Sequence, residues 1–461
     1  MRKGLINVSE ESVSVKKQEL MTEGTIWKKI LVFAVPLIIG NLLQQMYSTI
    51  DSIIVGHYVG KSALAAVGSS TSIINLLIAF SQGASVGAGV VISQYMGARD
   101  KKSVHSAVHT AAAVAVLLGL FLTLAGVLMS GQLLVRMQTP DDVINDSTLY
   151  LRVYSAGLVF NVVYNMATGI MNAAGNSKRP LIYLGVASVT NIVLDMLFIA
   201  VGGMGVEGAA IATDVSQAVS CVLAMIYLFR VDADYRISPK DMHINGHMLS
   251  KIIKIGLPTG IQSMVISLSN IIIQSSVNSF GSTQMAGFGA YMKVDGFNIL
   301  PVLSISMAVT TFVGQNYGAG RIDRVKKGAA VTVVMGLIYT ALTGILLLTF
   351  SEPIMRLFTD DADIIAAGEL AMKYFCPYYM LLSILNVLAG TVRGAGKSVP
   401  PMVILLFAMC VFRVLWIKLV LPHYNTIDVV YMVYPVSWVI GAALMALYTW
   451  KGKWLPVKSE A

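Results

Sequence analysis

Long apolar runs separated by short polar stretches constrain this chain more than any other feature. A helix needs about 20 apolar residues to cross a hydrocarbon core about 30 Å thick. Lipid offers the backbone no hydrogen-bond partner, so each such run is predicted to be an α-helix. The expected spans are 30–56, 66–93, 105–130, 149–173, 180–202, 206–230, 252–278, 286–313, 328–350, 371–391, 400–421 and 427–450. The chain is therefore predicted to be an all-α membrane protein with twelve transmembrane helices.

The composition excludes a soluble globular protein. Only 12% of the residues are charged, about half the roughly 25% that is usual in soluble domains. The three cysteines lie in apolar stretches without a shared spacing, so neither a disulfide framework nor a metal site is expected. The first 28 residues are polar and contain no apolar core of a signal peptide.

The basic residues predict the orientation of the chain. Most of the 33 Lys and Arg residues lie in the two tails and in alternate loops, all on one side of the predicted membrane. Basic loops stay on the cytoplasmic side. We therefore expect a multi-pass protein of the inner (plasma) membrane with both termini in the cytoplasm. The net charge of +9 is explained by this orientation, so the lipid bilayer is the expected partner and nucleic acid is not.

The second half of the chain repeats the first with a shift of 221 or 222 residues. Pro36 recurs as Pro258, and Gln94 recurs as Gln315. Each repeat holds an even number of spans, so the two halves have the same orientation, as in transporters whose substrate site lies between parallel repeats. The predicted organisation is a cytoplasmic tail (1–29), an N-lobe (30–230), a cytoplasmic linker (231–251), a C-lobe (252–450) and a cytoplasmic tail (451–461).

The repeat also shows where the two halves differ chemically. Three polar residues of the N-lobe align with apolar ones: Asp51 with Ile272 or Ile273, Asn191 with Phe412, and Asp195 with Trp416. A carboxylate at membrane depth costs at least about 2.5 to 3.5 kcal/mol, which points to a function. In the C-lobe, Lys293, Asp295 and Arg413 are candidates for structural ion pairs.

The polar residues of the N-lobe predict one site in the outer half of the membrane. Gln44, Tyr47 and Asp51 share one helix face, and Asn191 and Asp195 share another. Two carboxylates close together titrate as a coupled pair. The expected ion-coupling residues are Asp51, Asp195 and Asn191, and the expected substrate or cavity residues are Gln44, Tyr47, Asn161, Asn165, Thr213 and Asp214. Asp214 either joins the site or faces a water-filled cavity. Taken singly, the polar uncharged residues are more often helix-packing contacts than ligands, but their convergence on the two carboxylates favours a site.

No sequence pattern supplies a cofactor. Residues Thr391 to Ser398 nearly match a phosphate-binding loop, but Thr391 stands where its first glycine belongs, and no strand and helix flank it. No other nucleotide, metal or catalytic pattern was found. An enzyme is therefore not expected, and a proton or sodium gradient is the expected energy source for transport.

Four segments of the chain form a recognisable pattern: Pro36–Gly56, Ala63–Gly68, Thr190–Asp195 and Thr310–Gly320. In these segments the chain resembles the multidrug and toxic compound extrusion (MATE) family, and the resemblance runs from about Trp27 to Trp450. It implies a V-shaped pair of six-helix bundles that exports amphipathic, often cationic drugs in exchange for protons or sodium ions. It further implies that Pro36 is a hinge and that either Asn161 or Asn165 belongs to the site.

The resemblance leaves more than one subgroup and function possible. One branch of the family has acidic residues in its seventh and tenth spans, but the expected spans 252–278 and 371–391 contain none. This favours the subgroup whose acidic cluster lies in the N-lobe. A flippase for a lipid-linked or polyisoprenoid substrate is the alternative with the same architecture. A receptor or scaffold without transport is the alternative from another class. The sequence leaves the coupling ion, the substrate and the oligomeric state open.

Overall fold

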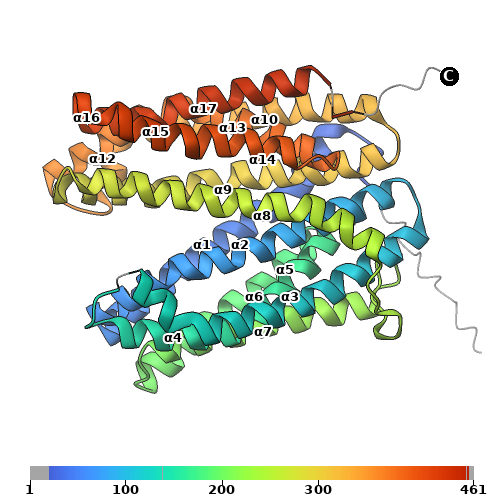
Figure 1. Ribbon diagram of the computed structural model, residues 1–461, viewed down its shortest axis with the longest axis horizontal. Coiled ribbons are helices and arrows are strands. Elements are labelled where there is room, and N and C mark those ends of the chain that lie inside the picture. The colour runs from blue at the N-terminus through green and yellow to red at the C-terminus, as the bar shows by residue number, and fades with distance from the viewer. Residues whose placement is uncertain (1–19, 138, 453, 456–461) are drawn as a thin grey trace, which may run out of the picture.

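The computed structural model describes residues 20–137, 139–452 and 454–455, and these form helices joined by short loops (Figure 1). The two expected tails lie partly outside the described residues. The helices of the first half are α1 (Ile26–Ile54), α2 (Lys61–Gly97), α3 (Lys101–Arg136), α4 (Ile144–Ala156), α5 (Leu158–Ala173), α6 (Lys178–Asp195) and α7 (Val206–Arg230). A π-helical turn follows α1 at Val55–Val59 and another follows α6 at Met196–Val201.

The second half repeats this order after a short 3₁₀ turn, Pro239–Asp241. Its helices are α8 (Gly246–Asn278), α9 (Ser282–Gly318), α10 (Ile322–Thr349), α11 (Ser351–Arg356), α12 (Ala362–Phe375), α13 (Tyr379–Gly394), α14 (Val399–Leu406), α15 (Phe412–Leu419), α16 (Leu421–Tyr424) and α17 (Ile427–Trp450). A 3₁₀ turn, Cys376–Tyr378, joins α12 to α13, and a π-helical turn, Phe407–Val411, joins α14 to α15. The predicted all-α fold is confirmed.

Eleven segments of the described residues are long and apolar enough to cross a membrane. The twelfth expected crossing, 149–173, is divided at Gly157 into α4 and α5. Each half alone is too short to span the hydrocarbon core. The twelve expected crossings are thus eleven continuous segments and one broken one.

Most of the helices begin earlier than their apolar runs predict. α1 begins at Ile26, inside the expected tail, and α8 begins at Gly246, inside the expected linker. The side chain of Asn245 caps α8 by accepting hydrogen bonds from two backbone N–H groups. Because α12 begins at Ala362, the tenth crossing contains Glu369, so the expectation that it carries no acidic residue is wrong. Glu369 accepts a hydrogen bond from Ser351 at 2.8 Å.

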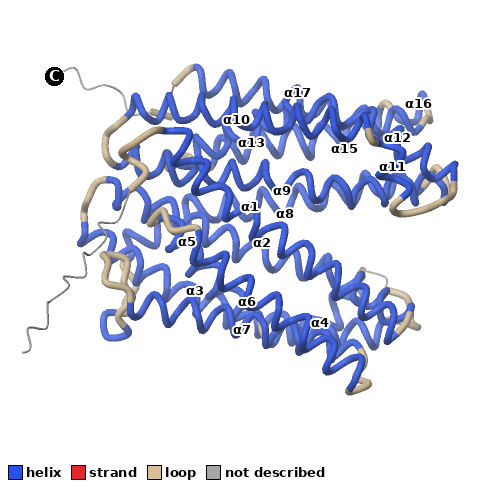
Figure 2. The backbone as a smooth tube through the Cα atoms, turned by 180° about the vertical axis from the view of Figure 1, so that it is seen from behind, coloured by secondary structure: helices blue, strands red, loops and turns tan. Residues whose placement is uncertain are grey.

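The helices form two bundles that spread apart toward one end of the molecule (Figures 1 and 2). One bundle contains α1 to α7 and the other α8 to α17, and they meet where α2 packs on α8 and where α1 and α2 pack on α9. Small residues allow this close approach. A Cβ atom on Gly83 would lie 2.7 Å from the Gly256 carbonyl oxygen, so only glycine fits at this crossing. The lobes are widest apart at the end opposite the C-terminus.

Candidate functional site

A cavity of about 680 Å³ lies between the lobes. Its wall is rich in Asn, Gln, Ser, Thr and Tyr side chains from α1, α2, α5 and α9. Among the described residues that line it, Asp51 is the only acid and Arg393 the only base. The cavity is therefore largely polar and carries one charge of each sign.

Asp51 and Asp195 lie next to each other although they come from different helices, α1 and α6. Their exposed fractions are 8% and 0%. One oxygen of Asp51 and both oxygens of Asp195 have no hydrogen-bond partner among the described residues. Asp195 directly precedes one π-helical turn, and Asp51 lies one helical turn before the other. Such turns are frequent at functional sites.

This carboxyl pair needs a positively charged partner. Two adjacent carboxylates removed from water and without donors repel each other, so both can be ionised only with a positive partner. A proton shared between them or a bound cation satisfies that requirement. The arrangement can therefore bind and release one positive charge.

The other predicted N-lobe residues surround this pair. Asn191 approaches Thr213 with its amide nitrogen 3.5 Å from the hydroxyl oxygen, while its amide oxygen has no partner among the described residues. The cavity wall includes Pro36, Gln44, Tyr47 and Thr213. Asn191 and Asp195 do not line the cavity and lie behind Asp51 and Thr213.

Both asparagines of the broken helix reach the cavity. Asn161 donates a hydrogen bond to the side chain of Gln217 at 3.0 Å, and Asn165 donates one to the side chain of Asn161 at 2.8 Å. Both side chains line the cavity. The two residues form one chain of hydrogen bonds, so no choice between them is required.

Asp214 lies outside the cavity wall, which corrects its assignment as a cavity residue. Thr213 lines the cavity, whereas Asp214, which points about 100° away from it on the same helix, does not. The Asp214 carboxylate instead contacts the backbone at Gly157, where a Cβ atom would collide with it. The lack of a side chain at Gly157 leaves room for this carboxylate against the break between α4 and α5.

The structure also corrects how the two halves align. Ile273 is 1% exposed and Ile272 is 41% exposed, so Ile273 is the buried counterpart of Asp51. In the eleventh crossing, the buried side chain is Arg413 rather than Phe412. A π-helical turn contains one more residue than an α-helical turn, and the turn at Phe407–Val411 moves the register by one. Arg413 therefore occupies the place of Asn191.

Arg393 and Asn172 are among the cavity residues that the sequence analysis missed. Arg393 was counted with the basic residues of a cytoplasmic loop, yet it belongs to α13 and lines the cavity. Asn172, which lies 221 positions earlier, also lines it. The repeat register was the signal that could have paired these two residues.

One end of the cavity is closed by contacts that obey the repeat symmetry. A Cβ atom on Gly97 would collide with the carbonyl oxygen of Gln315, and one on Gly318 with the carbonyl oxygen of Gln94. The side chain of Gln94 donates to the Gly394 carbonyl at 2.9 Å, and that of Gln315 donates to the Ala173 carbonyl at 2.8 Å. We call these four contacts the closed gate: two join α2 to α9, one joins α2 to the end of α13, and one joins α9 to the end of α5.

The segment before α1 covers the gate. The backbone of Met21 donates to Gln315 at 2.7 Å, and Arg321 and Arg324 donate to the carbonyls of Thr22 and Gly24 at 2.7 and 3.0 Å. These bonds fasten residues 20–25 to the C-lobe.

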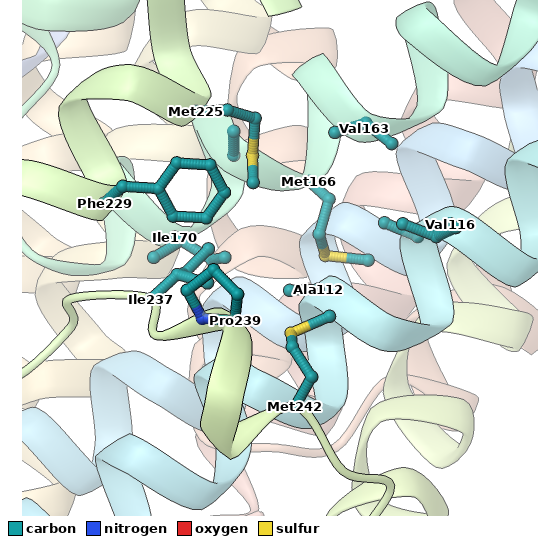
Figure 3. A pocket seen from close by; sticks show the side chains of 12 residues that line it. Ala112, Val116, Val163, Met166, Ile170, Met225, Phe229, Ile237, Pro239 and Met242 are labelled. Carbon is teal, nitrogen blue, oxygen red and sulfur yellow. The ribbon is translucent and has the colours of Figure 1, made fainter. Parts of the chain in front are cut away.

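The expected linker packs on the N-lobe and encloses a separate apolar pocket of about 190 Å³ (Figure 3). Met166, Met225 and Met242 point into it from α5, α7 and the linker. Beside the linker, His105, His109 and Asp241 lie close enough to hold a metal ion. Both ring nitrogens of His109 are, however, already hydrogen-bonded to the backbone of His105 and Ser238, which favours a structural role for this cluster.

Comparison with known proteins agrees with this architecture. The family model MatE matches residues 36–197 and 258–417, one match in each half. The Bacillus subtilis protein named "Probable multidrug resistance protein YpnP" is 31% identical over 392 residues, 85% of this chain and 88% of that protein. The Thermotoga maritima protein named "Probable multidrug resistance protein NorM" is 27% identical over 381 residues, 82% of each chain.

Among solved structures, a transporter of the MOP superfamily from Pyrococcus furiosus has the same fold. It superposes with a TM-score of 0.89 at 24% identity, covering 95% of this chain and 98% of the other. That structure is described as having a binding pocket of reversed polarity. The V-shaped pair of bundles expected from the sequence is confirmed.

Proposed function

The chain belongs to the MatE family, and from this premise we propose that it is a multidrug efflux transporter that works as a secondary antiporter. It exports amphipathic, cationic drugs or toxic compounds in exchange for protons or sodium ions. Curated relatives named as multidrug resistance proteins cover most of the chain and support export of drugs.

The observation that carries the coupling part of this proposal is the unpartnered carboxyl pair Asp51 and Asp195. The pair borders a cavity large enough for an organic molecule. A proton or sodium ion entering from the open end neutralises the pair and favours release of a cationic substrate. Loss of that ion toward the cytoplasm restores the negative site for the next substrate.

The two lobes and the gate support alternating access. The lobes rock so that the cavity closes at its open end and the gate between Gly97 and Gln315 opens. Pro36 lies in α1 and lines the cavity. It lacks the backbone N–H that a helix needs there, so α1 can bend at this hinge when Asp51 changes its charge.

The energetics allow a simple exchange. One inward proton swapped for one outward monovalent cation moves no net charge across the membrane, so the membrane potential contributes nothing. Each tenfold difference in proton concentration then supplies about 1.4 kcal/mol. A second inward ion adds about 2.3 kcal/mol per 100 mV.

Transport into liposomes tests the proposal. Purified protein is reconstituted, and movement of the cationic dye rhodamine 123 is measured with a proton gradient alone, a sodium gradient alone, and neither. We expect one gradient to accelerate the dye and thereby identify the ion. Equal rates in all three conditions would contradict coupled transport.

The cavity does not suit the flippase alternative. A substrate with phosphate groups calls for a basic cavity, whereas the described cavity wall holds one base and one acid.

We further propose that both termini are cytoplasmic, because the tails and alternate loops carry most of the basic residues. Labelling of a single cysteine introduced into the 231–251 segment, from each side of intact cells, checks the orientation.

A further inference from the structure

The closed end of the cavity between the lobes holds a positive charge without a counterion among the described residues. Arg393 lies in the last turn of α13 and lines the cavity. Its guanidinium group makes neither an ion pair nor a hydrogen bond with any residue in 20–137, 139–452 or 454–455. A guanidinium group offers five N–H donors in a fixed plane, and none of them is used.

The counterpart of Arg393 in the first half is equally unpartnered. Asn172 occupies the matching position at the end of α5 and is 2% exposed. Neither its amide nitrogen nor its amide oxygen has a partner among the described residues, although it lines the cavity. Buried amides without partners are rare, because each lost hydrogen bond is costly. Such a group at a cavity wall is ready for a ligand.

The gate contacts place these two residues at the closed end of the cavity, one in each lobe. The carbonyl that follows Arg393 belongs to Gly394 and accepts the Gln94 bond, while the carbonyl that follows Asn172 belongs to Ala173 and accepts the Gln315 bond. The two glutamines are themselves held together, because α2 and α9 cross at Gly97 and Gly318. Arg393 and Asn172 thus lie on either side of the crossing, one from each lobe, and both face the cavity.

We propose that Arg393 and Asn172 form a subsite for the carboxylate of a substrate. A planar guanidinium binds a carboxylate through two parallel hydrogen bonds, and the Asn172 amide supplies a further donor from the opposite lobe. With Asp51 as the acid elsewhere in the same cavity, the substrates that use both charges are zwitterionic amphiphiles. This inference rests on the proposed export function and specifies its substrate class.

The location gives the subsite a second consequence. A carboxylate held by both residues bridges the two lobes directly above the gate. Such a substrate must lose one of its two partners when the gate opens. Binding of a zwitterion therefore stabilises the form with the closed gate more than binding of a simple cation does.

A matched pair of dyes tests the subsite. Rhodamine 110 carries a free carboxylate and is a zwitterion, while rhodamine 123 is its methyl ester and carries only the positive charge. Binding of each dye to the purified protein in lipid nanodiscs is measured by fluorescence polarisation. A charge-assisted hydrogen-bond pair predicts that the acid binds about tenfold or more tightly than the ester.

Variants assign the preference to the two residues. Arg393→Gln should bring the affinity ratio of acid to ester close to one, and Arg393→Lys should restore part of it, because lysine keeps the charge but not the two parallel bonds. Asn172→Ala should lower the ratio about threefold. Arg152→Gln removes a charge at an exposed position of α4 and should keep the ratio of the unchanged protein.

The outcomes separate the subsite from the export proposal. Equal binding of both dyes to the unchanged protein, or an unaltered ratio in Arg393→Gln, overturns the subsite. An equal loss of both dyes in Arg393→Gln also overturns it, since this result assigns Arg393 to cavity structure. Ester transport that fails under every gradient overturns the export proposal, whichever dye binds better. Binding of neither dye overturns both.

Discussion

The two lobes bury acidic residues in opposite ways. In the C-lobe, Asp295 accepts a hydrogen bond from Tyr379 at 2.6 Å and another from Tyr291 at 3.3 Å. In the N-lobe, Asp51 and Asp195 face each other with three oxygens unpartnered. The same cost of burying a carboxyl group is thus offset inside the C-lobe and left open in the N-lobe. An exchangeable ion can offset the cost of burying the unpartnered carboxyl groups of the N-lobe.

The basic residue of the C-lobe follows the same principle. Arg413 donates through Nε to Ser437 at 3.0 Å and through Nη1 to Asn270 at 3.2 Å, and it lies over the ring of Tyr434. Only its Nη2 has no hydrogen-bond partner among the described residues. Its counterpart Asn191 leaves its amide oxygen unpartnered. The expected ion pairs among Lys293, Asp295 and Arg413 are not formed in the described residues. Two tyrosines donate to Asp295 instead, and uncharged polar and aromatic side chains contact Arg413.

Removing the N-lobe charge should have the largest effect. Asp51→Asn and Asp195→Asn each keep the size of the side chain but cannot cycle between charged and neutral forms. We expect gradient-driven dye export to fall at least about 100-fold, roughly the effect of losing 2.7 kcal/mol of coupling, in the liposome assay. Asp295→Asn is the matched control and should keep export within about twofold. Export that is lost in Asp295→Asn as well would remove the contrast between the lobes.

The gate should respond symmetrically although the lobes differ in chemistry. Gly97→Val and Gly318→Val each place side-chain atoms against a carbonyl oxygen of the other lobe. Overpacking of this kind costs about 1 to 3 kcal/mol, so both variants should shift the population by about 5- to 150-fold toward an open gate. Distances between spin labels on the two lobes report the shift. A large shift in one variant alone would show that the gate is not a symmetric device.

Stability should change in opposite directions in the two lobes. Asp295→Ala leaves the hydroxyl groups of Tyr291 and Tyr379 without their shared acceptor and should lower the free energy of unfolding by about 1 to 3 kcal/mol. Asp51→Asn removes a buried charge that has no donor and should leave stability unchanged or raise it. Thermal unfolding in detergent measures both. Destabilisation of similar size in the two variants would mean that Asp51 is a structural residue.

Much of the fold was predictable because its causes are local. Hydrophobic length locates the crossings, and an internal repeat of the sequence locates the two lobes. The break in the fourth crossing was not predictable from hydropathy, because it accompanies a contact between Gly157 and Asp214 of another helix. The one-residue change of register at the π-helical turn was missed for a similar reason, since an apolar run does not show how its backbone is bonded.

The sequence by itself determined that this chain spans a membrane, that it contains two like-oriented copies of one unit, and that buried carboxyl groups lie in the first copy. Only the tertiary structure decided which polar groups have partners. Asp295 is satisfied by a tyrosine 84 positions away, whereas Asp195 is not satisfied, and Arg393 faces the cavity rather than a loop. Hydropathy is a property of each segment, but a hydrogen-bond partner is supplied by whichever helix folds against it.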